Sequence, residues 1–404
     1  MRKTVLLVIT LDTKEESASY VVRAIEERGP KVLVMDAGVF PSRVMRGGIK
    51  REEVAAAGGR EIQRLIEGKD KGKAIETMIK GATFLTRSLY EKGKIDGILS
   101  LGGAQGTIIG TTAMKALPVG FPKLMVSTVA SGKRIFETYV DTSDITLMHS
   151  VVDFFGLNTI LKQILNNAAG AISGMVQTER VSAEKKRRVA ITIYGTTTPA
   201  GMAIVSLLEK AGYEVVAFHP NGVGGMAMER MIREGTFSGV IDLTTHELAD
   251  ELMGGGHACG PHRLEAASER KIPQIVVPGS IDYIVQGRFE TLRPSFKKRK
   301  TMLHNPEMTF VQTSIKEMAE LGRIIAEKMN HSKGKSMVMI PGLGFSYPNH
   351  KGRPLYNPKG CKAFAWALKE SIEDRIPVRE LPLHVNDEAF AKEVVREFRS
   401  MMEG

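Results

Sequence analysis

Short apolar runs alternate with segments of helical periodicity along the whole chain. Residues 4–10 form an apolar run rich in β-branched side chains. Residues 15–27 follow, and their apolar side chains recur at helical spacing, as at Ala18, Val21 and Ile25. Runs of the first kind predict buried strands, and segments of the second kind predict amphipathic helices. Their repeated alternation favours an α/β fold with mainly parallel sheets flanked by helices on both faces.

The same alternation continues to the end of the chain, with one interruption. Further strands are expected at residues 31–36, 95–101, 123–127, 189–194, 213–219, 239–243, 273–277 and 336–340. Further helices are expected at residues 51–66, 75–90, 151–175, 314–329, 359–370 and 387–401. The polar segment 177–188 lacks apolar periodicity, and 404 residues exceed what one hydrophobic core normally serves. We therefore predict two domains, 1–180 and 189–404.

Composition narrows the class of protein. Hydrophobic residues make up 43% of the chain and charged residues 25%, values typical of soluble globular proteins. Cys259 and Cys361 are too few for a disulfide framework and fit a reducing compartment. No apolar run approaches the ~20 residues that a membrane helix needs. We expect a cytoplasmic protein that does not associate with membranes.

The formal net charge of +11 raises the question of nucleic acid binding. Positive charge is spread along the chain, with local peaks at residues 184–188 and 297–300. Neither peak is interleaved with aromatic side chains that could stack on bases. The charge therefore predicts a surface that handles small anions rather than nucleic acid.

A glycine-rich turn follows the apolar run at residues 95–101 and leads into helix-like sequence. The turn comprises Gly102, Gly103, Ala104, Gln105, Gly106 and Thr107. Its glycines allow left-handed backbone angles and close approach to a ligand. The free amides and the dipole of the following helix favour an anion there, usually phosphate. The turn lacks the Gly-Lys-Thr/Ser ending of a Walker motif, so a lysine would have to come from another loop.

The end of the first strand offers that lysine. Thr10, Asp12, Thr13 and Lys14 should lie on the same sheet edge as the glycine turn, where open α/β sheets bind ligands. Lys14 could meet phosphate charge, the threonines could donate hydrogen bonds, and Asp12 could hold magnesium or a ribose hydroxyl. Alternatively, Asp12 or Thr13 caps the following helix. Together with the glycine turn, the loop favours nucleotide binding.

A second glycine loop lies in the second domain. Gly222, Gly224 and Ala227 fit the G-x-G-x-x-A dinucleotide pattern, and Asp242 lies where the ribose-binding acid should be. The loop follows the second strand of its domain, however, whereas the fingerprint normally follows the first. NAD(P) binding is therefore an alternative. We assign Asn221, Gly222, Gly224 and Gly225 to a small anionic substrate instead.

Four titratable residues near this loop are candidates for catalysis. They are His219, Asp242, His246 and Glu247, which could act as a general acid and base set or bind a divalent metal. His257, Cys259 and His262 are further possible metal ligands. Because the spacing matches no closed zinc site, we assign no metal.

Several segments of the chain together resemble a widespread two-domain family that includes the ATP-binding domain of a plant tobamovirus-resistance protein. They are residues 10–14, 102–107, 150–153, 156–158, 167–169, 218–219, 224–225, 279–282 and 384–387. The resemblance implies two Rossmann-like domains and a homodimer. It also implies ATP in the amino-terminal domain, at residues 10–14 and 102–107.

We therefore predict a cytoplasmic ATP-binding protein, with or without magnesium. We expect an enzyme that acts on a small anionic metabolite in a cleft between its two domains. One alternative is a non-catalytic regulator that ATP stabilises. The other is an NAD(P)-dependent oxidoreductase that uses the second glycine loop.

Overall fold

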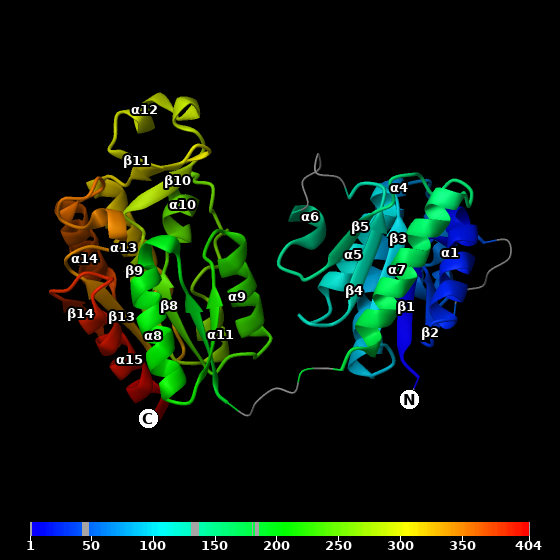
Figure 1. The fold of residues 1–404 in the computed structure, drawn as a ribbon, viewed down its shortest axis with the longest axis horizontal. Coiled ribbons are helices and arrows are strands. Elements are labelled where there is room, and N and C mark those ends of the chain that lie inside the picture. Colours follow the sequence, from blue (N-terminus) through cyan, green and yellow to red (C-terminus); the bar gives the residue numbers. More distant parts are fainter. Residues whose placement is uncertain (1, 43–47, 131–136, 180, 182–185, 404) are drawn as a thin grey trace. The chain divides into compact units, whose positions relative to one another are not determined.

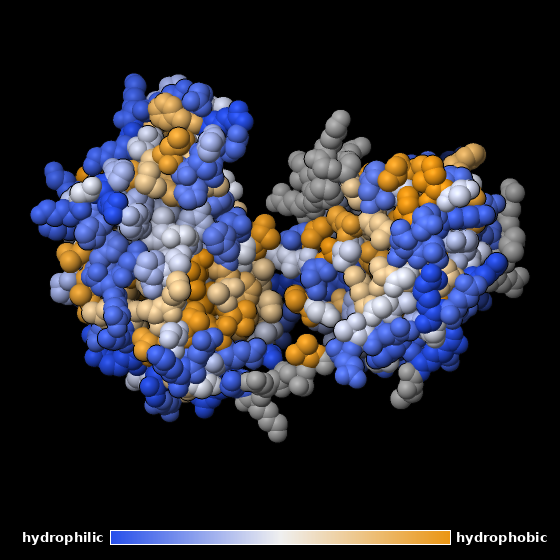
Figure 2. Space-filling view, in the orientation of Figure 1, coloured by the Kyte–Doolittle hydropathy of each residue, from blue (hydrophilic) through white to orange (hydrophobic). Residues whose placement is uncertain are grey.

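The protein is described by a computed structural model that covers residues 2–42, 48–130, 137–179, 181 and 186–403. The chain divides into two compact units, Met1–Ser182 and Ala183–Gly404, and Figure 1 shows helices and strands in each of them. On the face drawn in Figure 2, hydrophilic residues are interspersed with smaller hydrophobic areas in both units. Within the described residues, no helix is both long and apolar enough to span a bilayer.

The first unit is built on a parallel sheet of strand order β2-β1-β3-β4-β5. The strands are β1 (Thr4–Ile9), β2 (Lys31–Asp36), β3 (Gly97–Gly102), β4 (Lys123–Ser127) and β5 (Thr146–His149). The direction in which the sheet grows reverses between β1 and β3. Their carboxyl ends therefore flank a crevice, the usual ligand site of such sheets.

Helices cover both faces of this sheet. They are α1 (Leu11–Glu26), α2 (Arg51–Ala57), α3 (Ile62–Glu67), α4 (Lys71–Glu91), α5 (Ala104–Lys115), α6 (Glu137–Val140) and α7 (Thr159–Gln177). Along β1, Leu7 packs with α1 and α7, whereas Leu6 and Val8 pack with α2, α4 and α5 on the other face. Because successive strand residues face opposite sides and both sides are buried, the strand is apolar throughout.

The second unit has a parallel sheet of order β14-β13-β9-β8-β6-β7. Its strands are β6 (Arg188–Thr192), β7 (Glu214–Phe218), β8 (Gly239–Thr244), β9 (Gln274–Gly279), β13 (Ser336–Pro341) and β14 (Val378–Leu381). A small antiparallel sheet of order β10-β12-β11 adds β10 (Tyr283–Gln286), β11 (Thr301–Asn305) and β12 (Met308–Gln312). The order of the large sheet reverses between β6 and β8.

Helices again cover both faces of the large sheet. The α-helices are α8 (Thr198–Lys210), α9 (Val223–Arg233), α10 (Glu247–Met253), α11 (Ala266–Arg270), α12 (Pro294–Lys297), α13 (Ile315–Asn330), α14 (Pro358–Ser371) and α15 (Glu388–Glu403). Short 3-10 turns lie at η1 (Gly195–Thr197), η2 (Phe289–Thr291) and η3 (Tyr347–Asn349). Helices α8 and α15 pack on one face, and α9, α11, α13 and α14 pack on the other. The predicted α/β class, with mainly parallel sheets flanked by helices, is confirmed; the antiparallel sheet was not predicted.

Candidate functional site

A pocket of about 790 Å³ opens at the carboxyl edge of the first sheet, beside the point where strand order reverses. Small-molecule sites typically measure about 300–1,000 Å³. The loops after β1, β2 and β3 form its walls together with α3 and α4. The lining includes these residues of the predicted nucleotide site: Thr10, Asp12, Thr13, Lys14, Gly103, Ala104, Gln105 and Gly106.

Lys14 brings positive charge to this pocket. Its Nζ donates hydrogen bonds to Thr13 Oγ1 at 2.9 Å and to Thr10 Oγ1 at 3.3 Å. The backbone of Lys14 leaves helical geometry within α1, with φ −136° and ψ 27°. Burial lowers the pKa of Lys14, and the carboxylates of Asp12 and Asp153 oppose that shift. The ammonium group is thus held in a partly desolvated place, where its attraction for an anion is stronger than in water.

Helix α5 presents the amides of its first turn to the same pocket. Gly103 is the residue before the helix and provides no side-chain cap. The first helical hydrogen bond joins the amide of Thr107 to the carbonyl of Gly103 at 2.8 Å. The amides of Ala104, Gln105 and Gly106 precede this bond, so helical geometry gives them no carbonyl partner. Together with the helix dipole, these amides make a binding place for an anion.

The glycines of this turn do not use left-handed backbone angles, contrary to our expectation. Gly103 has φ −78°, and neither Gly102 nor Gly106 has positive φ. They permit close packing instead. A Cβ on Gly102 would lie 2.7 Å from the Cα of Gly106, and one on Gly106 would lie 3.2 Å from the carbonyl oxygen of Leu101. The missing side chains therefore let the end of β3 meet the start of α5.

Two of the predicted nucleotide-site residues support the pocket without lining it. Gly102 is buried at the end of β3. Thr107 is also buried, and its Oγ1 donates to the carbonyl of Gly103 at 2.8 Å and lies 2.6 Å from Ser127 Oγ. Thr107 thus ties α5 to the end of β4 and is a positioning residue, not a direct ligand contact.

The start of α1 is capped from another strand. Asp36, at the end of β2, accepts hydrogen bonds from the amides of Leu11 at 3.2 Å and Gly38 at 2.9 Å. Burial raises the pKa of Asp36, although these two amides oppose the shift. The capping role that Asp12 or Thr13 could have filled therefore belongs to Asp36.

Asp12 instead holds the loop after β2. Its Oδ2 accepts hydrogen bonds from the amides of Val39 at 3.3 Å and Phe40 at 3.2 Å. This fixes the loop that forms one wall of the pocket, and Phe40 on it is 58% exposed.

The remaining wall of the pocket is mainly apolar and comes from helices. Its side chains are Leu65, Ile66, Ala74, Ile75, Met78 and Ile109. An apolar wall that shares a pocket with a cation and a helix start suits a ligand with a flat ring and a phosphate tail. The motifs in the sequence did not indicate this wall.

In the second unit, the chain's own carboxylate occupies the second glycine loop. Glu247 Oε1 accepts hydrogen bonds from the amides of Gly222 at 2.8 Å and Gly225 at 3.0 Å. A Cβ on Gly225 would lie 1.9 Å from Glu247 Oε2, so the glycine leaves room for that carboxylate. Asn221 Oδ1 accepts from the amide of Gly224 at 3.2 Å, within the turn itself. The predicted substrate-binding role of this loop stays a prediction that the geometry does not favour, because Glu247 already occupies the amides of Gly222 and Gly225.

Asp242 and Glu247 belong to a buried ion-pair network. Arg263, 1% exposed at its side chain, reaches Asp242 at 2.6 Å, Glu247 at 2.8 Å and Glu229 at 3.0 Å. Gln274 also donates to Asp242 at 2.8 Å. Asp242 is therefore inaccessible to a ribose in this structure, and the assignment of Asp242 and Glu247 to catalysis stays a prediction that their burial does not favour. The carboxylates are buried because the arginine between them compensates their charge.

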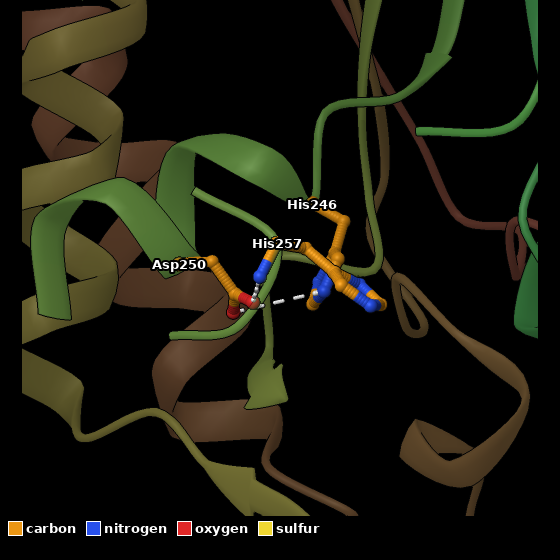
Figure 3. A group of neighbouring side chains, drawn as sticks. All are labelled: His246, Asp250 and His257. Atoms are coloured by element: carbon orange, nitrogen blue, oxygen red, sulfur yellow. Dashed lines mark hydrogen bonds and ion pairs between the residues drawn. The ribbon is translucent and has the colours of Figure 1, made fainter. Parts of the chain in front are cut away.

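The two predicted catalytic histidines lie against one aromatic ring. His246 is fully buried, and its ring stacks on Tyr194 with centroids 5.1 Å apart. His219 is exposed and stacks on the same tyrosine at 4.9 Å. Figure 3 shows His246 beside Asp250 and His257, a grouping that spacing alone did not indicate.

The other sulfur and imidazole candidates lie apart from this group. Cys259 Sγ donates to the carbonyl of Gly260, and burial raises its thiol pKa to about 12. His262 is 74% exposed at its side chain and pairs with Glu265 at 2.9 Å. Neither residue joins His246 and His257 in a ligand set among the described residues.

Family models match both units of the chain. The N-terminal domain of the Uncharacterised protein family UPF0261 matches residues 3–181, and its C-terminal domain matches residues 186–402. The chain belongs to the UPF0261 family.

Relatives agree with this assignment. A UPF0261 protein of Clostridium tetani is 41% identical over 405 residues, and the alignment covers 100% of both chains. The ToMV resistance protein Tm-1 of Solanum lycopersicum is 37% identical over 81% of this chain. That match spans 44% of the tomato protein, so the similarity covers less than half of it. The resemblance to a family that includes a tobamovirus-resistance protein is confirmed.

Among solved structures, the UDP-N-acetylglucosamine 2-epimerase of Rickettsia bellii aligns over 100% of this chain and 98% of its own. The sequence identity is 12% and the TM-score is 0.24. The fold assignment of this UPF0261 protein rests on its own strand order.

Proposed function

We propose that the first unit of this UPF0261 protein binds ATP in the pocket at its sheet edge. The observation that carries the proposal is the division of one pocket into a polar part and an apolar part. Lys14 and the first-turn amides of α5 form the polar part, and residues of α3, α4 and α5 form the apolar part. The family resemblance noted in the sequence points to the same ligand.

Each part of the nucleotide has a matching surface in this proposal. The phosphates lie against the amides of Ala104, Gln105 and Gly106, with the ammonium group of Lys14 beside them. The adenine lies against the apolar wall, which includes Met78 and buries its ring from water.

The carboxylate of Asp12 adds a magnesium or ribose contact to this proposal. Its Oδ2 is engaged by two loop amides, and a carboxylate has further lone pairs for a cation or a hydroxyl. Isothermal titration with and without magnesium therefore forms part of the test below. Dimerisation and a cytoplasmic location stay predictions of the sequence.

Replacing Lys14 by methionine tests the site directly. Methionine keeps much of the side-chain volume but removes the charge, so one charge-assisted contact worth about 1.5–3 kcal/mol is lost. We expect the Kd for ATP, measured by isothermal titration calorimetry, to rise about 10–100-fold. Unfolding temperature without ATP should change little, because Lys14 bonds only to two threonine hydroxyls of its own loop among the described contacts.

Lys80→Met is the matched control. Lys80 lies on α4, which also lines the pocket, but its own side chain is exposed and pairs with Glu76 at 2.6 Å. Its replacement should leave ATP affinity unchanged. Equal affinity in wild type and Lys14→Met would remove the pocket as the nucleotide site.

A further inference from the structure

His246, Asp250 and His257 form a compact group of metal-ligating side chains in the second unit, separate from the nucleotide pocket. One nitrogen or oxygen of each residue lies within 4.8 Å of the others, and Figure 3 shows the side chains directed toward one another. His246 and Asp250 are four residues apart at the start of α10, so they share one face of the helix. His257 comes from the loop that follows.

Hydrogen bonding fixes the state of the His246 ring. Its Nδ1 lies 2.8 Å from the carbonyl oxygen of Ser280, which can only accept, so Nδ1 carries the proton. In a neutral ring, Nε2 then has its lone pair free.

The free lone pair of His246 points at another acceptor. Nε2 is fully buried, has no hydrogen-bond partner in the described part of the chain, and lies 3.6 Å from Asp250 Oδ1. A buried acceptor without a donor is costly, and two acceptors that face each other repel. A positively charged group between them would remove both costs.

Asp250 is arranged as a carboxylate. Its Oδ1 accepts from the amide of Val285 at 3.0 Å, and its Oδ2 accepts from the amide of His257 at 2.7 Å. Both bonds favour the charged form of the carboxyl group. The Asp250–His257 bond also ties the second histidine's backbone to the group. Each oxygen retains a lone pair for a metal.

The surroundings resemble those of a metal site at a sheet edge. Strand order in the second sheet reverses between β6 and β8, and His246 follows β8. Tyr194, which follows β6, stacks on His246, and its hydroxyl lies 3.4 Å from His257 Nδ1. The bond from His246 Nδ1 to a carbonyl is the outer contact that most metal-bound histidines make. His257 is only partly buried, which leaves a route from solvent.

We propose that His246 Nε2, Asp250 and His257 bind a divalent transition-metal ion of the zinc class. Two imidazoles and one carboxylate suit such ions, whereas magnesium and calcium prefer oxygen ligands throughout. Ligand atoms about 2.0–2.1 Å from a tetrahedral zinc lie roughly 3.3–3.5 Å apart, close to the 3.6 Å between Nε2 and Oδ1. Three protein ligands leave a coordination position for water or for an oxygen of an anionic ligand.

Metal titration of the full-length protein tests this site. The protein is stripped with a chelator, and Zn²⁺ and Co²⁺ are added, with visible absorption of cobalt reporting nitrogen and oxygen ligation. We expect one equivalent per chain and no comparable binding of Mg²⁺ in the absence of nucleotide. Replacing His246 or His257 by alanine should weaken Zn²⁺ binding at least about 100-fold, because loss of a direct ligand lowers metal affinity more than loss of a residue that only hydrogen-bonds to a ligand.

His262→Ala is the control, because His262 lies near the same loop but is exposed and pairs with Glu265. It should bind zinc like wild type. His257→Ala is included because loss of the buried His246 ring could impair folding, whereas His257 is only partly buried. ATP titration of the same variant shows that the first unit is intact. Absence of stoichiometric zinc binding in wild type, or unchanged binding in folded His257→Ala, would overturn the proposal without bearing on the ATP site.

Discussion

Replacing Arg263 by methionine is expected to unfold the second unit or to lower its unfolding free energy by about 3–5 kcal/mol. The substitution leaves Asp242, Glu247 and Glu229 buried without their shared cation. Glu247 would still accept hydrogen bonds from the amides of Gly222 and Gly225, but its carboxylate would have lost the guanidinium group beside it. Calorimetric unfolding, with hydrogen exchange of peptides from residues 186–403, measures the loss and assigns it to this unit.

The pH dependence of this variant separates charge from packing. Burial raises the pKa of Glu229, and loss of Arg263, whose charge opposes that shift, should raise it further. Lower pH then protonates Glu229, so the deficit of Arg263→Met should be smaller at pH 5 than at pH 7. Arg323→Met, which removes an exposed ion pair with Glu320, should change stability by less than about 0.5 kcal/mol. A deficit of equal size in Arg323→Met would contradict the assigned role of Arg263.

The strands that carry both cores could be predicted because each sheet is buried on both faces. Residues 4–10 and 239–243 are mainly apolar, and they contain most of β1 and β8. Strands β5 and β11 are among those that were missed. Strand β5 has the burial pattern of an edge, and β11 has three exposed residues, so neither stands out from its neighbours as an apolar run.

The pocket of the first unit could be predicted in part for a related reason. Thr10–Lys14 and the glycine turn each follow an apolar strand directly, so sheet topology brings them to one edge. The apolar wall was missed because Leu65 and Met78 lie on amphipathic helices, where they look like ordinary core residues. Sequence spacing does not tell which apolar residues of a helix line a cavity.

In the second unit, the ion pairing of the charged residues could not be predicted, because their partner is distant in sequence. Asp242 lies in β8 and Glu247 shortly after it, whereas Arg263 comes from a loop without a recognisable pattern. Asp250 was missed for a different reason. It lies one turn into α10, and its relation to His257 depends on the fold of the loop that follows.

The two sheets place their candidate sites at equivalent points. The first pocket lies where order reverses between β1 and β3, and the His246 group lies where order reverses between β6 and β8. The two glycine-rich loops differ in whether their backbone amides are free to bind an anion. Helix α5 has free first-turn amides, whereas the amides of Gly222 and Gly225 already hold Glu247. The proposed phosphate site therefore lies in the first unit, where the α5 amides are unoccupied, and not in the second glycine loop.

Substituting alanine at Gly102 is expected to disrupt the start of α5, whereas alanine at the adjacent Gly103 should be tolerated. A Cβ on Gly102 would lie 2.7 Å from the Cα of Gly106 and 3.3 Å from the amide nitrogen of Thr107, and backbone atoms cannot move aside as a flexible side chain does. Overpacking of this kind costs about 1–3 kcal/mol. We expect Gly102→Ala to lower the stability of the first unit by that amount and to abolish measurable ATP binding, because the amides of α5 shift.

Gly103→Ala is the matched control for this effect. A Cβ there would lie 3.6 Å from Thr128 Oγ1, an ordinary contact, and φ of −78° suits alanine. Its unfolding free energy should stay within about 0.5 kcal/mol of wild type. Denaturant unfolding of both variants, together with ATP titration, measures the difference. If the two variants behaved alike, close packing of β3 on α5 could not be the reason for glycine in this turn, and a need for backbone freedom would again have to be considered.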